Sequence, residues 1–238
     1  MTEKTIRERL EDNGIPFQDE LPEKLAVYFS LLQEWNARMD LTAVMAEEET
    51  LDRHFMDSLT VLKTGLIPSG ASLIDVGTGA GFPGMALALA RPDLAVTLLD
   101  AQQKRLNFLQ AVADAAEAKN VMLIHARAEE GGRKKGLRDA FDIAAARAVA
   151  PLNVLCEYLL PFVKPEGMAL CWKGPAIRNE LDAGRKAAHL LGGQMEMPVS
   201  VPVAGRDWDH LILPIRKITN TPAAYPRKAG MPKQKPVS

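Results

Sequence analysis

The feature that most constrains this chain is the segment LIDVGTGAGFPG at residues 73–84, where an apolar run leads directly into a glycine-rich loop. Gly77, Gly79 and Gly81 carry no side chains, so their backbone N–H groups can approach a ligand closely. The helix expected after the loop would turn its positive N-terminal end toward the same ligand. Asp100 ends the next apolar run, where a carboxylate can accept hydrogen bonds from both hydroxyls of a ribose. The segment therefore predicts a strand, a loop and a helix that bind a nucleotide-like ligand.

Two overlapping motifs in this loop indicate different ligands. Read from Gly79, the loop spells GxGxxG, which is typical of dinucleotide binding; read from Asp75, it spells DxGxGxG, which suits S-adenosylmethionine. The apolar run ends at Val76, which places the Asp75 carboxylate at the strand end, where it can face the cationic amino group of a methionine moiety. A pyrophosphate would be repelled by the same carboxylate. The register favours the methyl donor over a nicotinamide or flavin dinucleotide.

Short apolar runs alternate with helical patterns beyond residue 70, as in β-α-β units of a parallel sheet. Strands are expected at 72–76, 96–99, 121–125, 141–145 and 168–172, and helices at 83–91, 103–118, 152–163 and 177–191. Two extended runs, 195–203 and 210–215, follow without room for a helix between them. The pattern predicts an α/β protein with the class I Rossmann-like methyltransferase fold: a mostly parallel seven-stranded sheet with an antiparallel last strand.

Pattern and charge divide the chain into three parts. Residues 1–69 form an N-terminal helical extension, because apolar residues recur there at helical spacing, and they carry 14 acidic against 7 basic residues. Residues 70–216 form the S-adenosylmethionine-dependent methyltransferase domain. Residues 217–238 form a basic C-terminal tail, since the last acid of the chain precedes His210 and six Lys or Arg follow it.

Composition argues against several other classes of protein. The apolar runs are far shorter than the roughly 18 residues of a membrane-spanning helix, and the first residues lack the apolar centre of a signal peptide. The two cysteines, Cys156 and Cys171, form no CxxC pair and lie in apolar stretches, so we expect core residues and neither a disulfide framework nor a zinc site. We expect a cytoplasmic monomer that uses no metal and binds no membrane.

The candidate acceptors are narrowed by residues the chain lacks. A cytosine-C5 enzyme needs a reactive cysteine, and an adenine-amine enzyme usually carries an Asn/Asp-Pro-Pro-aromatic stretch after the fourth strand, where this chain has ARAVAP at residues 146–151. A ring nitrogen with a free lone pair, such as nitrogen-7 of guanine, needs only to be held in line with the sulfonium.

Four residues after predicted strands are candidates for contacts at the ligand edge of the sheet. Arg147 could touch the donor or the target base, or only pair with a loop acid. Ala128 and Glu129 could meet the adenine ring, or form an ordinary acidic first helical turn. Lys173 could reach a phosphate, or be a solvated lysine at a strand end. We assign Arg147 and Lys173 positioning roles rather than acid or base roles.

One helical turn near the N-terminus carries His54, Asp57 and Ser58 on a single face. These side chains could face the ligand cleft, or they could be a hydrogen-bonded cluster that packs the helix on the sheet.

The basic tail is the candidate RNA-binding segment, because its cations can neutralise phosphates and its tyrosine can stack on a base. Arg133, Lys134, Lys135 and Arg138 form a second basic loop, which could equally be a solvated surface loop. The predicted RNA-binding residues are Lys217, Tyr225, Arg227, Lys228, Lys233 and Lys235.

The chain resembles the bacterial ribosomal small-subunit methyltransferase G family, also called glucose-inhibited division protein B. The resemblance rests on WN at 35–36, LT at 41–42, RHFMDSL at 53–59, DVGTGAGFPG at 75–84, LLDAQQKRLNFL at 98–109, RAEE at 127–130, ARA at 146–148 and YPRKAGMPKQKP at 225–236. It implies an enzyme that uses S-adenosylmethionine to methylate nitrogen-7 of one guanosine, at position 527, of 16S ribosomal RNA in the small ribosomal subunit. It also implies donor-binding positions at Gly77, Phe82, Ala128, Glu129 and Arg147.

Two other functions remain open at this point. A small-molecule methyltransferase would share the donor site but have no use for a basic tail. An RNA-binding assembly factor with a vestigial donor pocket would bind RNA and transfer no methyl group.

Overall fold

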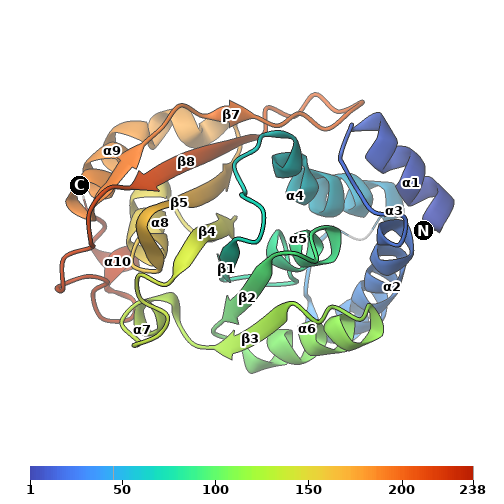
Figure 1. Ribbon diagram of the computed structural model, residues 1–238, viewed down its shortest axis with the longest axis horizontal. Coiled ribbons are helices and arrows are strands. Elements are labelled where there is room, and N and C mark those ends of the chain that lie inside the picture. The colour runs from blue at the N-terminus through green and yellow to red at the C-terminus, as the bar shows by residue number, and fades with distance from the viewer. Residues whose placement is uncertain (45, 238) are drawn as a thin grey trace.

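The centre of the molecule is a sheet of parallel strands with one antiparallel strand inserted near its edge, as the computed structural model shows for residues 1–44 and 46–237 (Figure 1). The sheet order is β3-β2-β1-β4-β5-β8-β6, with β7 paired to β8. β8 runs antiparallel to both β5 and β6. The strands are β1 (Ser72–Val76), β2 (Ala95–Asp100), β3 (Val121–His125), β4 (Phe141–Arg147), β5 (Val163–Lys173), β6 (Gly193–Met195), β7 (Val199–Ser200) and β8 (Leu211–Lys217).

The expected α/β fold and terminal hairpin are confirmed, with one difference in the strand count. The run expected at 195–203 is two short strands, β6 and β7, separated by a segment that contains Pro198. Proline has no N–H group for the ladder and interrupts a strand pattern. β4 forms although three consecutive alanines give it weak strand propensity, because β1 and β5 pair with it on both sides.

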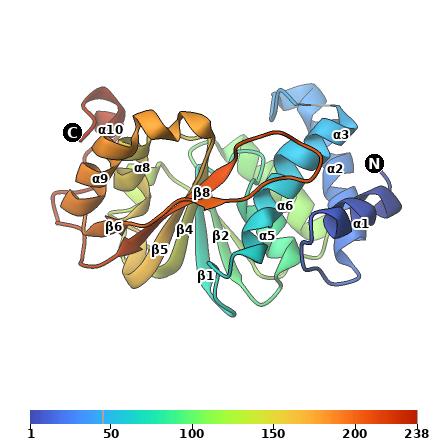
Figure 2. The same cartoon turned by 90° about the horizontal axis from the view of Figure 1, so that it is seen from above.

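Helices cover both faces of the sheet and enclose two separate cores (Figure 2). One core packs α5 (Gly84–Ala90) and α6 (Gln103–Ala115) with the N-terminal helices, and the other packs α8 (Leu152–Leu159) and α9 (Leu181–Leu190). Alternate strand residues supply them: Leu73 faces the first core, and Ile74 faces the second. The short helices are α7 (Ala128–Gly131), η3 (Pro175–Asn179) and α10 (Met231–Gln234).

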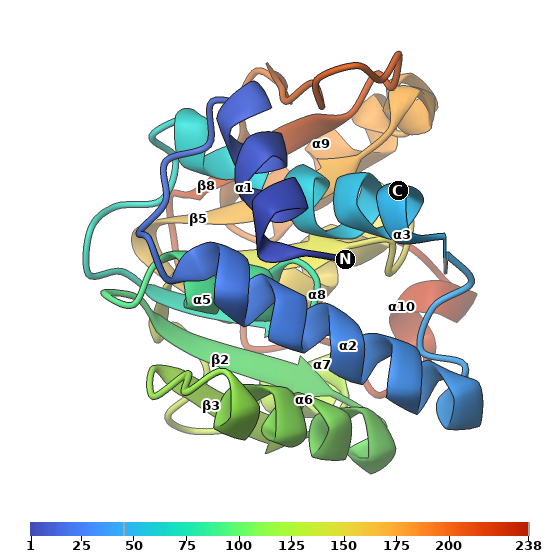
Figure 3. The same ribbon diagram turned by 90° about the vertical axis from the view of Figure 1, so that its right-hand side faces the viewer.

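The N-terminal residues form helices that pack against the α5 and α6 side of the sheet (Figure 3). They are α1 (Glu3–Asp12), α2 (Leu21–Met39), α3 (Glu47–Thr50), η1 (Leu51–Met56), α4 (Asp57–Leu59) and η2 (Thr60–Lys63). The helical spacing read from sequence is right for α2, but η1 is a π-helix. Such widened turns often occur at functional sites, and this one contains His54 and immediately precedes Asp57.

Within the described residues, no helix is long and apolar enough to cross a membrane. The basic C-terminal tail packs against α8 and contains α10. Lys217 belongs to β8, and Ser238, the last residue of the predicted tail, lies outside the described part of the chain.

Candidate functional site

The glycine-rich loop is fixed by hydrogen bonds to its neighbouring strand and to two carboxylates. The Gly77 and Thr78 N–H groups donate to the Leu99 carbonyl, at 2.8 and 3.1 Å. The Gly79 N–H donates to Asp100 Oδ2 at 2.9 Å. Gly77 and Gly79 both have positive φ, +73° and +61°, which L side chains adopt only with strain. The loop conformation is therefore fixed by hydrogen bonds within the protein itself.

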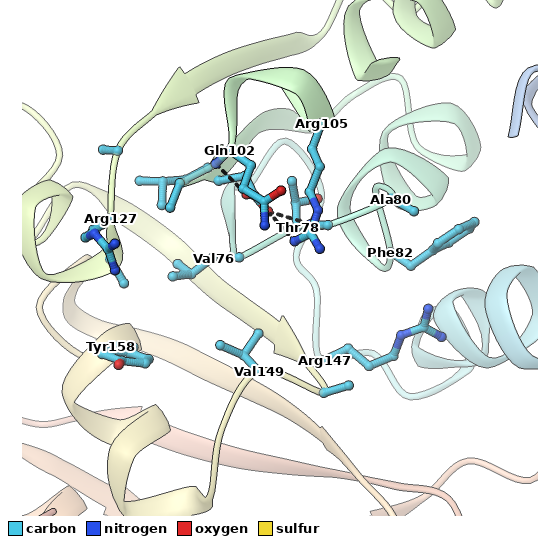
Figure 4. Close-up of a pocket in the computed structure, with 18 of the residues that line it drawn as sticks. Val76, Thr78, Ala80, Phe82, Gln102, Arg105, Arg127, Arg147, Val149 and Tyr158 are labelled. Carbon is cyan, nitrogen blue, oxygen red and sulfur yellow. Dashed lines mark hydrogen bonds and ion pairs between the residues drawn. The ribbon is translucent and has the colours of Figure 1, made fainter. Parts of the chain in front are cut away.

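A cavity of about 520 Å³ opens above this loop and extends along the carboxyl ends of β1 to β4. Its volume lies in the ordinary range for a small-molecule site. Figure 4 shows Phe82 and Arg147 toward one end of it, and Arg127 and Tyr158 toward the other. The predicted donor-binding residues that line it are Gly77, Gly79, Phe82, Asp100, Ala128, Glu129 and Arg147.

Asp100 occupies the position expected of a ribose-binding acid. Its Oδ1 accepts from the Gln102 N–H at 2.8 Å, and its Oδ2 accepts from Gly79. Arg105 lies 3.5 Å from the same oxygen. Each carboxylate oxygen has two lone pairs, so capacity remains for hydroxyl donors on the cavity side. These residues fit the ribose of S-adenosylmethionine.

Asp75 does not line the cavity, contrary to the expectation that it faces the donor's amino group. Its Oδ2 accepts from Thr78 Oγ1 at 2.7 Å and from the Gly84 N–H at 2.8 Å, so it joins the two ends of the loop. Oδ1 is buried without a hydrogen-bond partner among the described residues. Burial raises the pKa of Asp75 to about 6, even though these hydrogen bonds lower it. The sequence correctly placed Asp75 at the strand end but could not show which way its side chain points.

Gly81 and Phe82 serve packing more than ligand approach. A Cβ on Gly81 would lie 2.3 Å from Tyr28 Oη and 2.6 Å from Leu109, so only glycine fits beneath α2. The Phe82 ring stacks between Tyr28 and His54, with centroid distances of 5.2 and 4.9 Å. Phe82 also lines the cavity, so its position is compatible with the donor-binding role implied by the resemblance as well as with packing.

A second cavity, of about 370 Å³, adjoins the first and shares His54, Arg147 and Ala148 with it. The expected cluster on the N-terminal helix lies at this junction. Arg147 donates to Asp57 Oδ2 at 2.8 Å, to the Arg53 carbonyl at 2.6 Å and to His54 Nδ1 at 3.1 Å. Ser58 is buried and donates to the His54 carbonyl, so it supports the helix instead of facing a ligand.

The charges at this junction are strongly coupled. Burial and the Arg147 guanidinium lower the pKa of His54 to about 4. Burial alone would raise the pKa of Asp57, but hydrogen bonds from His210 and Arg147 outweigh it and hold that pKa below its ordinary value. Because Arg147 donates to Nδ1, the neutral His54 carries its proton on Nε2 and donates it to Thr42 Oγ1 at 2.8 Å. Asp57 and Arg147 thus form a charged pair beside a neutral imidazole.

Lys173 lines the second cavity, but its ammonium group is already hydrogen-bonded within the protein. Its Nζ donates to Glu180 Oε2 at 2.7 Å and to the Ala150 carbonyl at 3.1 Å. Its side chain is only 12% exposed, so the solvated strand-end alternative is wrong.

The basic tail separates into buried and exposed cations. Lys217 is fully buried and donates to the Leu160 carbonyl and to Thr221 Oγ1, so the expectation that it binds RNA is not compatible with its position. Arg227 pairs with buried Glu157 at 2.6 Å and lies 5.8 Å from the Tyr225 ring. The exposed cations, which keep their predicted role as candidates, are Lys228, Lys233 and Lys235.

The sequence did not predict that His210, Gly230 and Lys233 line the cavities. His210 lines the second cavity and binds Asp57 Oδ1 at 2.7 Å, although 153 residues separate the two. Gly230 and Lys233, of the tail, line the first cavity. No spacing in the sequence links these positions to the glycine loop. The one sequence signal that could have pointed to the tail as part of the site was the YPRKAG stretch, which precedes α10.

Known proteins similar to this chain include rRNA methyltransferases. A family model described as rRNA small subunit methyltransferase G matches residues 21–210. The chain is 44% identical over 227 residues to a ribosomal RNA small subunit methyltransferase G of Clostridium botulinum, a match that covers 95% of each protein. It is 43% identical over 232 residues to one of Alkaliphilus oremlandii, a match that covers 98% of this chain and 97% of that relative.

Solved structures show the fold. A 16S rRNA (adenine(1408)-N(1))-methyltransferase from Catenulisporales acidiphilia matches with a TM-score of 0.52 and 18% identity, covering 66% of this chain and 92% of that one. M. jannaschii TYW2 in complex with AdoMet matches with a TM-score of 0.54 and 15% identity, covering 75% of this chain and 81% of that one.

Proposed function

The chain belongs to the rRNA small subunit methyltransferase G family, and we infer that it is an S-adenosylmethionine-dependent methyltransferase that modifies nitrogen-7 of one guanosine in 16S ribosomal RNA. The observation that carries this proposal is the pair of adjoining cavities that share His54, Arg147 and Ala148. One cavity is lined by the glycine-rich loop and Asp100, whose polar groups suit a nucleoside-type donor. The other offers a neighbouring place for an acceptor base.

The donor side is proposed to hold S-adenosylmethionine along the loop. Asp100 would accept the ribose hydroxyls. Ala128 and Glu129 would border the adenine, since both line the cavity and directly follow Arg127, which lies at the end opposite Phe82 and Arg147. The bound donor supplies an electrophilic methyl group on a sulfonium. Phe82 would cover the end of the cavity near Arg147 and help exclude water there. The turn at Gly77 would let the backbone approach the donor closely.

The acceptor side is proposed to position the base without acid or base catalysis. Nitrogen-7 of guanine attacks with its own lone pair, so no side chain has to remove a proton. Arg147, fixed by Asp57 and the Arg53 carbonyl, would orient the base at the shared wall, and positioning of this kind can supply much of a rate enhancement. Lys173, anchored to Glu180, would keep a cation at the edge of the second cavity.

Cysteine chemistry does not fit the site. Cys156 and Cys171 are fully buried, as expected from sequence, and burial raises the pKa of both thiols, that of Cys171 to about 12. A nucleophilic thiolate must be accessible and ionised. A mechanism through a covalent cysteine adduct is therefore not supported.

Methyl transfer to small ribosomal subunits from cells lacking this gene tests the proposal. Label from S-adenosylmethionine recovered as 7-methylguanosine at one position is the expected result. No label on RNA, together with tight donor binding, would contradict it and favour a small-molecule acceptor. RNA binding without any methyl transfer would favour an assembly factor.

Deleting residues 217–238 does not separate these alternatives. The deletion would remove buried Lys217 from β8 and break the Arg227 pair with Glu157, so a loss of activity could reflect structure instead of RNA binding. Substitution of the exposed lysines is the better test.

A further inference from the structure

The tail returns to the protein as a strap, here defined as residues 221–234, that crosses α7 and α8 (Figure 1). It contains two buried prolines, Pro226 and Pro232, among exposed lysines. Pro226 packs so closely on Gly132 that a Cβ there would lie 3.1 Å from its ring. A segment this closely packed is part of the folded domain and not a solvated RNA-binding arm.

The second basic loop holds the strap. Arg133 donates to the Pro226 carbonyl at 2.6 Å and to the Ala224 carbonyl at 2.9 Å. Arg138 donates to the Tyr225 carbonyl at 2.8 Å and to the Thr221 carbonyl at 2.6 Å. A guanidinium presents five donors in a rigid fork, which suits it to bind several carbonyls at once. Two of the four cations in this loop are therefore directed at the chain itself.

Two carboxylates, one on α7 and one on α8, complete the attachment. Glu157 of α8 accepts from the Arg227 backbone N–H at 2.7 Å and from its guanidinium at 2.6 Å, and its side chain is 1% exposed. Glu129 of α7 accepts from the Gly230 N–H at 2.8 Å and is 5% exposed. Glu129 is also a lining residue of the donor cavity. One side chain therefore connects the strap to the donor cavity.

We propose that the strap is a positioning element for the donor, an inference that rests on the donor site proposed above. The strap fixes Glu129 and supplies Gly230 and Lys233 to the wall at the adenine end of the cavity. Arg133 and Arg138 act through the strap and do not line the cavity. Because binding linkage is reciprocal, an ordered strap strengthens donor binding, and a bound donor in turn protects the strap from opening.

The first test compares two double variants of the same loop. Arg133→Ala with Arg138→Ala releases the strap, while Lys134→Ala with Lys135→Ala removes the same charge from exposed positions between them. Donor affinity is measured on full-length protein by calorimetry with S-adenosylmethionine and with S-adenosylhomocysteine. The arginine pair is expected to weaken binding about tenfold, within the usual range of coupling between sites, and the lysine pair to leave it unchanged.

Equal donor affinity in both double variants would overturn the inference. A wild-type chain that binds neither probe would overturn the proposed function and this inference with it. If the arginine variant fails to fold, hydrogen exchange on the wild-type chain decides. Amides of residues 225–234 are expected to exchange several-fold more slowly with S-adenosylhomocysteine bound, and unchanged exchange would contradict the coupling.

Discussion

The two cavities differ in how far apart in the sequence their parts lie. In the donor cavity, the bonds that shape the loop join residues close in sequence: Gly84 to Asp75 over 9 residues and Gly79 to Asp100 over 21. In the second cavity, Arg147 meets Asp57 across 90 residues, Trp172 meets the Asp57 carbonyl across 115, and His210 meets its carboxylate across 153. A local motif encodes the loop at the centre of the first cavity, whereas the contacts that shape the second form only when the complete fold is assembled.

This difference affects what each site depends on. The donor loop depends on backbone conformation, so its weak points are glycines. The second site depends on a buried charged pair, so its weak point is the loss of one partner, which leaves the other charge unpaired. Phe82 links the two, because it lies in the donor loop and its ring is 5.3 Å from the Arg147 guanidinium, which lines both cavities.

The largest effect is expected from Arg147→Ala. It removes the cation shared by both cavities and leaves Asp57 buried with only His210 as its side-chain partner among the described residues. Methyl transfer to small subunits should fall about 100- to 1000-fold, roughly 3–4 kcal/mol of transition-state stabilisation. Circular dichroism checks that the fold persists, and Arg147→Lys should recover only part of the rate because an ammonium cannot reproduce the fork. Normal turnover by the Arg147→Ala variant would show that Arg147 has no positioning role in methyl transfer.

The next effect distinguishes two glycines of the donor loop. Gly81→Ala should destabilise the fold by about 2–4 kcal/mol, because it combines a φ of +96° with a Cβ 2.3 Å from Tyr28 Oη. Gly79→Ala is the matched control, with a φ of +61° and the nearest outside atom 3.9 Å away. It should cost only about 1 kcal/mol. Chemical denaturation measures both, and equal losses would show that steric contact with α2 is not what requires Gly81.

The same difference explains what the sequence could predict. Strand β1, the turn at Gly77 and the position of Asp100 follow from local patterns within residues 72–100, and each lies where expected. Arg147 was predicted at the ligand edge because it follows a predicted strand, and it lines both cavities. His210 was missed because its role depends on the insertion of β8 beside β5. Only the packed chain brings that strand and the N-terminal helix together.

The cations of the tail show a second limit. Charge alone does not distinguish a solvated lysine from one that binds buried oxygens, so Lys217 and Lys228 looked alike in the sequence. In the structure the first is fully buried and the second exposed. The direction of Asp75 was missed for a related reason, since a strand-end acid can bind the loop as readily as a ligand.

A moderate effect of pH is expected from His54. Its pKa is lowered from an ordinary value of 6.5 to about 4 in the folded chain, so the unfolded chain binds a proton first as pH falls. Stability attributable to His54 is therefore lost between about pH 6.5 and 4, by about 1–2 kcal/mol at pH 5. Asp75 opposes this, because its raised pKa makes the folded chain bind the proton first below about pH 6. Asp75 is present in both the wild-type chain and the His54→Gln variant, so comparing the two isolates the contribution of His54 to the pH dependence of stability.

Denaturation at pH 7.5 and 5 measures that comparison. The wild-type chain should lose about 1–2 kcal/mol more than His54→Gln over this interval. An identical loss in both chains would show that His54 is not held neutral beside Arg147, and the tight junction between the two cavities would have to be reconsidered.

The smallest effect is expected from substitution of single lysines of the tail. It tests whether the exposed lysines of the tail contact RNA while the buried one does not. Lys228→Ala should weaken RNA binding only a few-fold and lower the salt dependence by about one counterion, as expected when one phosphate contact is lost. Lys217→Met removes an equal charge from a buried position, where Nζ binds the Leu160 carbonyl, so the salt slope should not change. Binding to small subunits across a salt series gives both slopes. Equal slopes for the two variants would mean that the buried and exposed lysines of this segment do not differ in their contact with RNA.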